Sequence, residues 1–420
     1  MFAALLLTVA APAAAETVAI TAAHMIDVIT GRRVDNPVVI ATDGRITAVG
    51  RQGTVAIPAG ARRIDLAGKT ILPGFIDMHV HLSSSPFYGP YDTLQFTDQF
   101  ETVLGVGNAR DMLRAGFTTV RNLGSSDYAD VAYKQAIQEG RMVGPRIVPA
   151  AYSLGATGGH CDSNFLPPSM AQKDPGVADG PQALRALVRQ QRKFGAEVIK
   201  VCATGGVFSR NTEPGQQQLS EEELRAIAQE AHQWGLKVAA HAHGAAGIKA
   251  AIRAGIDTIE HASLVDDEGI RLAVARPQPV WFSMDIFNTD YTQSEGKKNG
   301  ILEDNLRKDR EISLIQRQNF QKAHRAGVRM VFGSDAGVMP HGTAAGQFAT
   351  MVKWGMTPME AIQAGTRNAA QALGREKDVG AIAVGRFADI VAVDGDPLAD
   401  VAELAGVDVV IKGGVVVGKD

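Results

Sequence analysis

Two histidines, His79 and His81, close the apolar stretch "GFIDMHVHL" over residues 74–82. Side chains two residues apart on a β-strand point to the same side, so both imidazoles face the same way. Imidazoles gathered on one face are common ligands of divalent metal ions. The spacing therefore predicts a metal site at the end of this strand.

Polar residues recur at the ends of later apolar stretches, although strands covered on both faces should be apolar. A single histidine at a strand end is more often a hydrogen-bonded residue than a ligand. Here, however, the polar residues follow the order of the predicted strands, and parallel barrels carry their chemistry at these ends. We therefore expect one metal site that contains His79, His81, Lys200, His241, His261 and Asp335.

Lys200 lies inside the apolar sequence "VIKVCA", between Ile199 and Val201. An ammonium group there would be costly beside metal ions unless its charge were removed or paired. Carbamylation by CO2 would turn the side chain into a carboxylate-like ligand that can bridge two divalent ions. The alternative is a lysine that reaches solvent from a strand end, but its position inside the apolar run argues against this.

The elements that must position these residues are eight apolar runs between residues 71 and 384, which alternate with amphipathic stretches. This alternation is typical of βα units and a parallel sheet. The stretch "SEEELRAIAQEAHQWG" (residues 220–235) opens with a capping box and closes on glycine, which predicts a helix. Eight such units predict an α/β fold, namely a (β/α)8 TIM barrel.

Both ends of the chain, residues 16–70 and 385–420, consist of short alternating segments punctuated by turns. Such segments predict strands and hairpins. Two β-rich ends around a different middle predict one small β-sandwich domain built from both termini. The barrel of residues 71–384 would then be inserted between them.

The first fifteen residues, "MFAALLLTVAAPAAA", combine a short apolar stretch with three alanines before Glu16. This pattern predicts a signal peptide and a secreted or periplasmic protein. A net charge of -3 over 420 residues indicates no nucleic-acid partner. The sequence after these residues contains no apolar run of about 18 residues, the length that would predict a membrane span. Two cysteines, Cys161 and Cys202, are too few for a disulfide framework, so neither is assigned a role.

The ligand pattern resembles the amidohydrolase superfamily, in its binuclear branch with a carbamylated lysine. Histidines on strand one, lysine on strand four, histidines on strands five and six and aspartate on strand eight carry the resemblance. It covers essentially the whole chain. The strings "AGFTTVRNLG", "TGGH", "VIKVCATGGV" and "VAAHAHGAAGIKAAIRAGIDTIEHASL" are similar to the Xaa-Pro dipeptidase and carboxypeptidase-like group, which includes ochratoxin-hydrolysing amidohydrolases.

The resemblance implies two divalent metal ions, with zinc suited to these ligands. One ion would be held by His79, His81 and Asp335, the other by His241 and His261, with carbamylated Lys200 between them. A hydroxide shared by the ions would attack an amide carbonyl. Asp335 would accept its proton and pass it to the leaving amine.

Three further residues receive roles that the resemblance implies. His160, in "TGGH", would polarise the carbonyl or stabilise the oxyanion. Tyr291, in "NTDYTQSEGKKNG", would bind the free carboxylate of the substrate. His243 would orient a ligand or contact the substrate. His341, between Pro340 and Gly342, is interpreted as a turn residue without a role in the site.

The resemblance implies hydrolysis of the amide bond to a C-terminal amino acid in dipeptides or N-acyl amino acids, with ochratoxin A as one candidate. Cyclic-amide hydrolases of the imidazolonepropionase type and one-metal deaminases are alternatives, but these relatives lack the strand-four lysine. A periplasmic binding protein without catalysis is a third alternative, because fold does not determine function. Such a protein would be expected to have lost a ligand or Asp335. A homo-oligomer is expected, while the preferred residue stays open.

Overall fold

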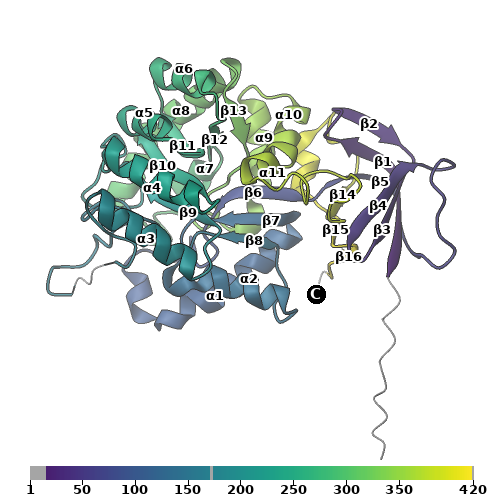
Figure 1. The fold of residues 1–420 in the computed structure, drawn as a ribbon, viewed down its shortest axis with the longest axis horizontal. Helices are drawn as coiled ribbons and strands as arrows, with labels where there is room; N and C mark the ends of the chain where they lie inside the picture. The colour runs from purple at the N-terminus through teal and green to yellow at the C-terminus, as the bar shows by residue number, and fades with distance from the viewer. Residues whose placement is uncertain (1–15, 171–173, 419–420) are drawn as a thin grey trace, which may run out of the picture.

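The computed structural model describes residues 16–170 and 174–418, and the predicted signal peptide, residues 1–15, lies outside the described residues. Strands from both chain ends form one sheet beside an α/β body (Figure 1). Along this sheet the order is β16-β15-β14-β5-β1-β3-β4, and β2 pairs with β1. Its strands are β1 (Thr17–Asp27), β2 (Arg32–Asp35), β3 (Pro37–Thr42), β4 (Arg45–Arg51), β5 (Arg62–Pro73), β14 (Ile390–Val393), β15 (Val409–Lys412) and β16 (Val415–Val416).

The pairing of β5 explains how distant parts of the sequence meet in this sheet. β5 runs parallel to β1 and antiparallel to β14, so the chain returns to the N-terminal strands after the α/β body. β5 ends at Pro73, three residues beyond the boundary expected from the sequence. Gly74 then leads directly into the first strand of the body, at a point where a Cβ atom would lie 2.2 Å from Thr118 Oγ1. The sandwich arrangement of this domain stays a prediction.

The eight apolar runs of the middle region each contain a strand, as predicted. These strands are β6 (Phe75–Val80), β7 (Phe117–Asn122), β8 (Arg146–Pro149), β9 (Val198–Cys202), β10 (Lys237–Gly244), β11 (Thr258–Leu264), β12 (Trp281–Ser283) and β13 (Arg329–Val331). All pair in parallel, in one sheet ordered β6-β7-β8 and another ordered β13-β12-β11-β10-β9.

Backbone bridges connect both edges of the smaller sheet to the larger one. Val80 bridges to Ala336, just beyond β13, and Leu154, beyond β8, bridges to Val201 on β9. The Leu154 amide donates to the carbonyl of Lys200 at 2.8 Å. The strands therefore follow one another in sequence order, with their carboxyl ends at a common edge.

Helices connect the strands and cover the α/β body (Figure 1). The predicted capping box is present on α4, where Ser220 and Glu223 bond each other's backbone amides. No helix within residues 16–170 and 174–418 is long and apolar enough to cross a membrane. The helices are α1 (Asp98–Arg114), α2 (Ala129–Gln138), α3 (Pro181–Lys193), α4 (Glu221–Gln233), α5 (Ala245–Ala254), α6 (Asp267–Ala275), α7 (Asn288–Glu295), α8 (Glu303–Arg325), α9 (Gly346–Lys353), α10 (Pro358–Ala364) and α11 (Arg367–Leu373).

Asp257 ties one end of the β-strands together, opposite the edge that carries the histidines. Its carboxylate accepts hydrogen bonds from His232 Nε2 at 2.8 Å, Lys237 Nζ at 3.0 Å and the Val238 amide at 2.9 Å. Burial acts to raise the pKa of Asp257, but the bond from His232 and the charge of Lys237 outweigh it, so the pKa is lowered. The carboxylate form therefore stabilises the junction of α4, β10 and β11.

Asp257→Asn is expected to lower the free energy of unfolding by about 2 kcal/mol at pH 7, because charge-assisted bonds are lost. A lowered pKa in the folded state gives stability that is present above the pKa of the unfolded state and is lost as the pH falls through the folded value. The difference between wild type and variant should therefore shrink below about pH 4. Urea unfolding measured from pH 3 to 7 checks this, and a constant difference would contradict it.

Candidate functional site

A cavity of about 460 Å³ opens at the carboxyl ends of the strands. Its wall contains eight of the nine residues predicted for the site, which come from β6, β9, β10, β11 and the loops after β6, β8 and β13. These residues are His79, His81, His160, Lys200, His241, His243, His261 and Asp335. The ninth, Tyr291, is not among the described residues that line the cavity.

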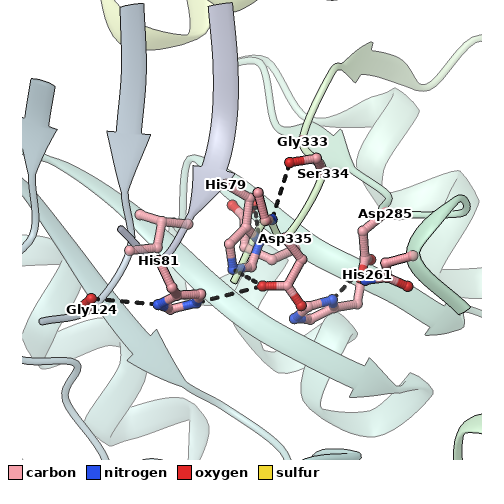
Figure 2. Close-up of polar contacts among 12 residues, drawn as sticks. His79, His81, Gly124, His261, Asp285, Gly333, Ser334 and Asp335 are labelled. Atoms are coloured by element: carbon pink, nitrogen blue, oxygen red, sulfur yellow. Dashed lines mark hydrogen bonds and ion pairs between the residues drawn. The ribbon is translucent and has the colours of Figure 1, made fainter. Parts of the chain in front are cut away.

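Asp335 lies at the centre of this group, as Figure 2 shows. Its Oδ1 atom is 3.4 Å from His79 Nε2 and 3.6 Å from His81 Nε2. Lys200 Nζ lies 3.3 Å from the same His79 nitrogen. His79 is fully buried, whereas His81 is half-buried at the cavity wall. One carboxylate, one amine and two imidazoles thus converge on a single point.

Two site residues have a left-handed backbone, which costs energy for any residue other than glycine. The φ angle is 67° at His261 and 57° at Asp335. The Asp335 amide donates to the carbonyl of His79 at 2.8 Å. Next to it, the Asp77 carboxylate accepts from the Ser334 amide at 3.1 Å and from the Ser334 hydroxyl at 2.5 Å. These bonds to β6 hold the strained turn in place.

Burial sets the protonation of the cavity side chains. It lowers the pKa of His79 and His241 well below the ordinary value, and that of His81 and His160 to about 3. It also lowers the pKa of Lys200 to about 8, although nearby carboxylates oppose it. The imidazoles are therefore neutral and keep a free lone pair, as does the unprotonated fraction of the Lys200 amine. Metal binding and carbamylation require this state.

The pKa values of Asp335 and His261 are raised instead. Burial raises the pKa of Asp335, because its charged form is desolvated. For His261, burial lowers the pKa, but the charge of Asp285 outweighs this and the pKa is raised. Asp285 thus compensates for the burial of the histidine, as a carboxylate behind a metal-binding imidazole often does.

The outer nitrogens of two histidines are bound to the protein. His261 Nδ1 lies 2.9 Å from Asp285 Oδ1, and His241 Nε2 lies 3.0 Å from the carbonyl of Gly205. These contacts leave the second nitrogen of each ring available to a ligand. Asp285 was not predicted, although it follows β12 in the seventh apolar run and meets the criterion that identified the other residues.

The donors fit divalent metal ions. Ligand atoms lie within 4.8 Å of one another in two buried groups: His79, His261 and Asp335, and His241, His243 and His261. Neutral imidazole and carboxylate are ligands of zinc and similar ions. The grouping differs from the division expected from the sequence, because His261 belongs to both groups and His243 joins one of them. The two ligand sets predicted earlier stay a prediction.

His160 lines the same cavity from the loop after β8. Its ring stacks on His241 with centroids 4.0 Å apart, and its Nδ1 atom is 2.7 Å from Ser209 Oγ. Gly206 is required here, because a Cβ atom would approach the His160 ring to 2.4 Å. The next residue, Cys161, forms a disulfide with Cys202 on β9, with Cα atoms 5.8 Å apart. Assigning the cysteines no role was therefore wrong.

Tyr291 and His341 are not among the described residues that line the cavity. Tyr291 is on α7, where its hydroxyl accepts a hydrogen bond from Asn299 at 3.1 Å, and its contact with a substrate carboxylate stays a prediction. His341 is buried in a short 3-10 turn and its Nε2 donates to the carbonyl of His81 at 3.1 Å. This position agrees with its interpretation as a turn residue, and the bond ties the turn to the segment after β6 that carries His81.

Comparison with known proteins agrees with this site. The model of the amidohydrolase family matches residues 70–417. Ochratoxinase of Aspergillus niger is 33% identical over 352 residues, which are 79% of this chain and 71% of that protein. A Xaa-Pro dipeptidase with bound methionine in its active site has a TM-score of 0.90 at 33% identity, covering 96% of this chain and all (100%) of that one.

A prolidase complexed with N-methylphosphonate-L-proline is similar as well. It has a TM-score of 0.88 at 30% identity, and the match covers 96% of this chain and 100% of that one. The family model, the relatives and the cavity lined with metal ligands agree. The chain belongs to the amidohydrolase family and is a hydrolytic enzyme that acts on carbon–nitrogen bonds.

Proposed function

We propose that this enzyme uses two divalent metal ions, with zinc as the first candidate, to hydrolyse the amide bond to a C-terminal amino acid. Its substrates would be dipeptides or N-acyl amino acids, and ochratoxin A is one candidate. The observation that carries the proposal is Lys200, buried in β9 with its amine 3.3 Å from the ligand nitrogen of His79. The resemblance to a dipeptidase, a prolidase and an ochratoxinase supports the substrate class.

Lys200 is suited to carbamylation because its lowered pKa, about 8, leaves a fraction of the amine unprotonated near neutrality. The amine nitrogen would attack CO2, forming an N–C bond and releasing one proton. The product is an anion with two oxygens, which removes the cost of a buried ammonium group. His79, His81, His241, His261 and Asp335 would complete the metal site.

When bound, the two ions supply an activated water and polarise the substrate carbonyl. The protein supplies the proton transfer. Asp335 faces the cavity within 3.6 Å of both strand-one imidazoles, and burial raises its pKa, so it can accept a proton and return it to the departing amine. His160, which also lines the cavity, can donate a hydrogen bond to the carbonyl oxygen.

The cavity wall also contains apolar side chains and carboxylates, so its composition does not favour one kind of C-terminal substrate residue. Apolar surface comes from Tyr152, Phe165, Phe208, Ile312 and Val338. Glu101, Asp162 and Asp174 add negative charge. A substrate panel must therefore cover proline, apolar, basic and small residues.

We propose further that the eight parallel strands form a (β/α)8 barrel over residues 71–384, flanked by a β-sandwich domain of residues 16–70 and 385–420. The bridges at both edges of the smaller sheet support the barrel. Residues 1–15 would direct the chain out of the cytoplasm. The disulfide supports this location, because such bonds persist in oxidising compartments. We propose a homo-oligomer on the resemblance alone.

The full enzyme, loaded with zinc in the presence of bicarbonate, is expected to release free amino acid from some members of a panel of dipeptides and N-acyl amino acids. Because the site is proposed to hold two ions, a metal count should give about two per chain. Amino-acid release and elemental analysis measure both. One metal per chain, with turnover of cyclic amides only, would favour the imidazolonepropionase-like alternative.

Lys200→Ala is expected to abolish activity and reduce the bound metal, because the bridging ligand is lost. Lys249→Ala is a matched control, since Lys249 on α5 pairs with Asp266 and Glu268, and none of the three is among the described residues that line the cavity. Elemental analysis and amino-acid release compare the two variants. Wild-type turnover by Lys200→Ala would exclude the binuclear arrangement.

Asp335→Asn is expected to reduce kcat by about 10²- to 10⁴-fold, because a positioned proton acceptor is removed. The fold should stay intact, because the amide can occupy the same space. Steady-state kinetics and circular dichroism test this, with Asp257→Asn as a control carboxamide at the opposite end of the strands. Near-normal kcat in Asp335→Asn would assign proton transfer to another residue.

A further inference from the structure

A buried ion pair lies beneath the proposed metal site, between β7 and β11. Arg121 and Glu260 are both almost completely buried. Arg121 Nη2 donates to Glu260 Oε1 at 2.7 Å, and its Nε donates to the carbonyl of Met78 at 2.5 Å. Arg121 Nη1 donates to the Thr258 hydroxyl at 2.9 Å, and that hydroxyl donates to Glu260 Oε1. One oxygen of Glu260 therefore accepts two hydrogen bonds.

The other oxygen of Glu260 faces the first predicted ligand. Oε2 lies 3.3 Å from His79 Nδ1, on the side of the ring away from Asp335. The contact lacks full hydrogen-bond geometry, and neither atom has another hydrogen-bond partner among the described residues. A buried polar atom without a partner is costly, so each of these atoms requires the other.

We propose that Glu260 is a positioning residue that fixes the tautomer of His79. A neutral imidazole carries one N–H, and a carboxylate can only accept, so the proton must lie on Nδ1. The lone pair of Nε2 then points to Lys200 Nζ, 3.3 Å away, and to Asp335 Oδ1, 3.4 Å away. The inference rests on the proposed metal site, because it explains how His79 is prepared to bind the ion.

The position of Arg121 allows the tautomer assignment to be tested by replacing one carboxylate oxygen of Glu260 with an amide nitrogen. In Glu260→Gln, the amide oxygen must face Arg121 Nη2 and the Thr258 hydroxyl, since both donate to that position. The amide NH2 group then faces His79 Nδ1, and it can only donate. The imidazole proton would therefore move to Nε2, where it blocks metal binding. A residue that merely neutralised Arg121 would have no such effect.

The test measures the His79 tautomer and the metal affinity separately. In the metal-free full chain, ¹⁵N NMR of labelled histidine should show the proton on Nδ1 in wild type and on Nε2 in Glu260→Gln. The His79 signals are assigned by their absence in His79→Asn. Zinc affinity, measured by competition with a chelator, should fall about 10- to 100-fold in Glu260→Gln. Asp257→Asn is the control and should change neither quantity.

A second variant is needed because Glu260→Gln leaves the Arg121 charge buried without its charged partner, which destabilises the fold. Arg121→Met/Glu260→Leu removes both charges and the acceptor together, an exchange that buried ion pairs often tolerate. Here His79 should populate both tautomers, so zinc affinity should fall only by the fraction of His79 lost to the Nε2–H form, which is less than in Glu260→Gln.

The outcomes separate this inference from the function on which it rests. If wild type binds no zinc, the proposed metal site fails, whereas the NMR result still decides the role of Glu260. If wild type binds zinc, and whichever variant folds keeps both the Nδ1 proton and the wild-type affinity, the positioning role is overturned. Loss of affinity with an unchanged tautomer would also overturn it.

Discussion

Four charged or chargeable side chains, Arg121, Lys200, Glu260 and Asp335, lie buried around His79. Desolvation makes each of them unfavourable unless a partner compensates, and this constraint governs the site. Arg121 and Glu260 satisfy each other directly, while burial moves Lys200 and Asp335 toward their neutral forms. A metal ion and a carbamate would resolve the remaining mismatch. The arrangement of these side chains would thus be completed by the charges of a metal ion and a carbamate, which the polypeptide itself does not contain.

Much of this site could be predicted because polar residues are rare in strands that are buried on both faces. Lys200, His241 and Asp335 stand out for that reason, and the structure places them in the cavity wall. The eight strands were predicted from apolar runs that alternate with amphipathic stretches. β5 continues to Pro73, past the expected boundary at residue 70, because β5 and β6 run together with only Gly74 between them and apolar composition does not distinguish their sheets.

Glu260 escaped prediction for a specific geometric reason. Alternation along a strand places neighbouring side chains on opposite faces, so Glu260 and His261 would not be expected to serve one site. His261 departs from the strand conformation with a φ of 67°, and this turn brings it to the site together with its neighbour. The disulfide was missed for a different reason, since spacing does not reveal which residues meet across 41 positions.

The Cys161–Cys202 bond also links two parts of the cavity wall. Cys202 follows Lys200 on β9 by two residues, and Cys161 follows His160 directly, so the bond joins the strand that carries Lys200 to the loop that carries His160. A barrel that folds in a reducing cytoplasm would possess its ligands before this covalent link. Oxidation would then act as a final step that fixes the His160 loop against β9.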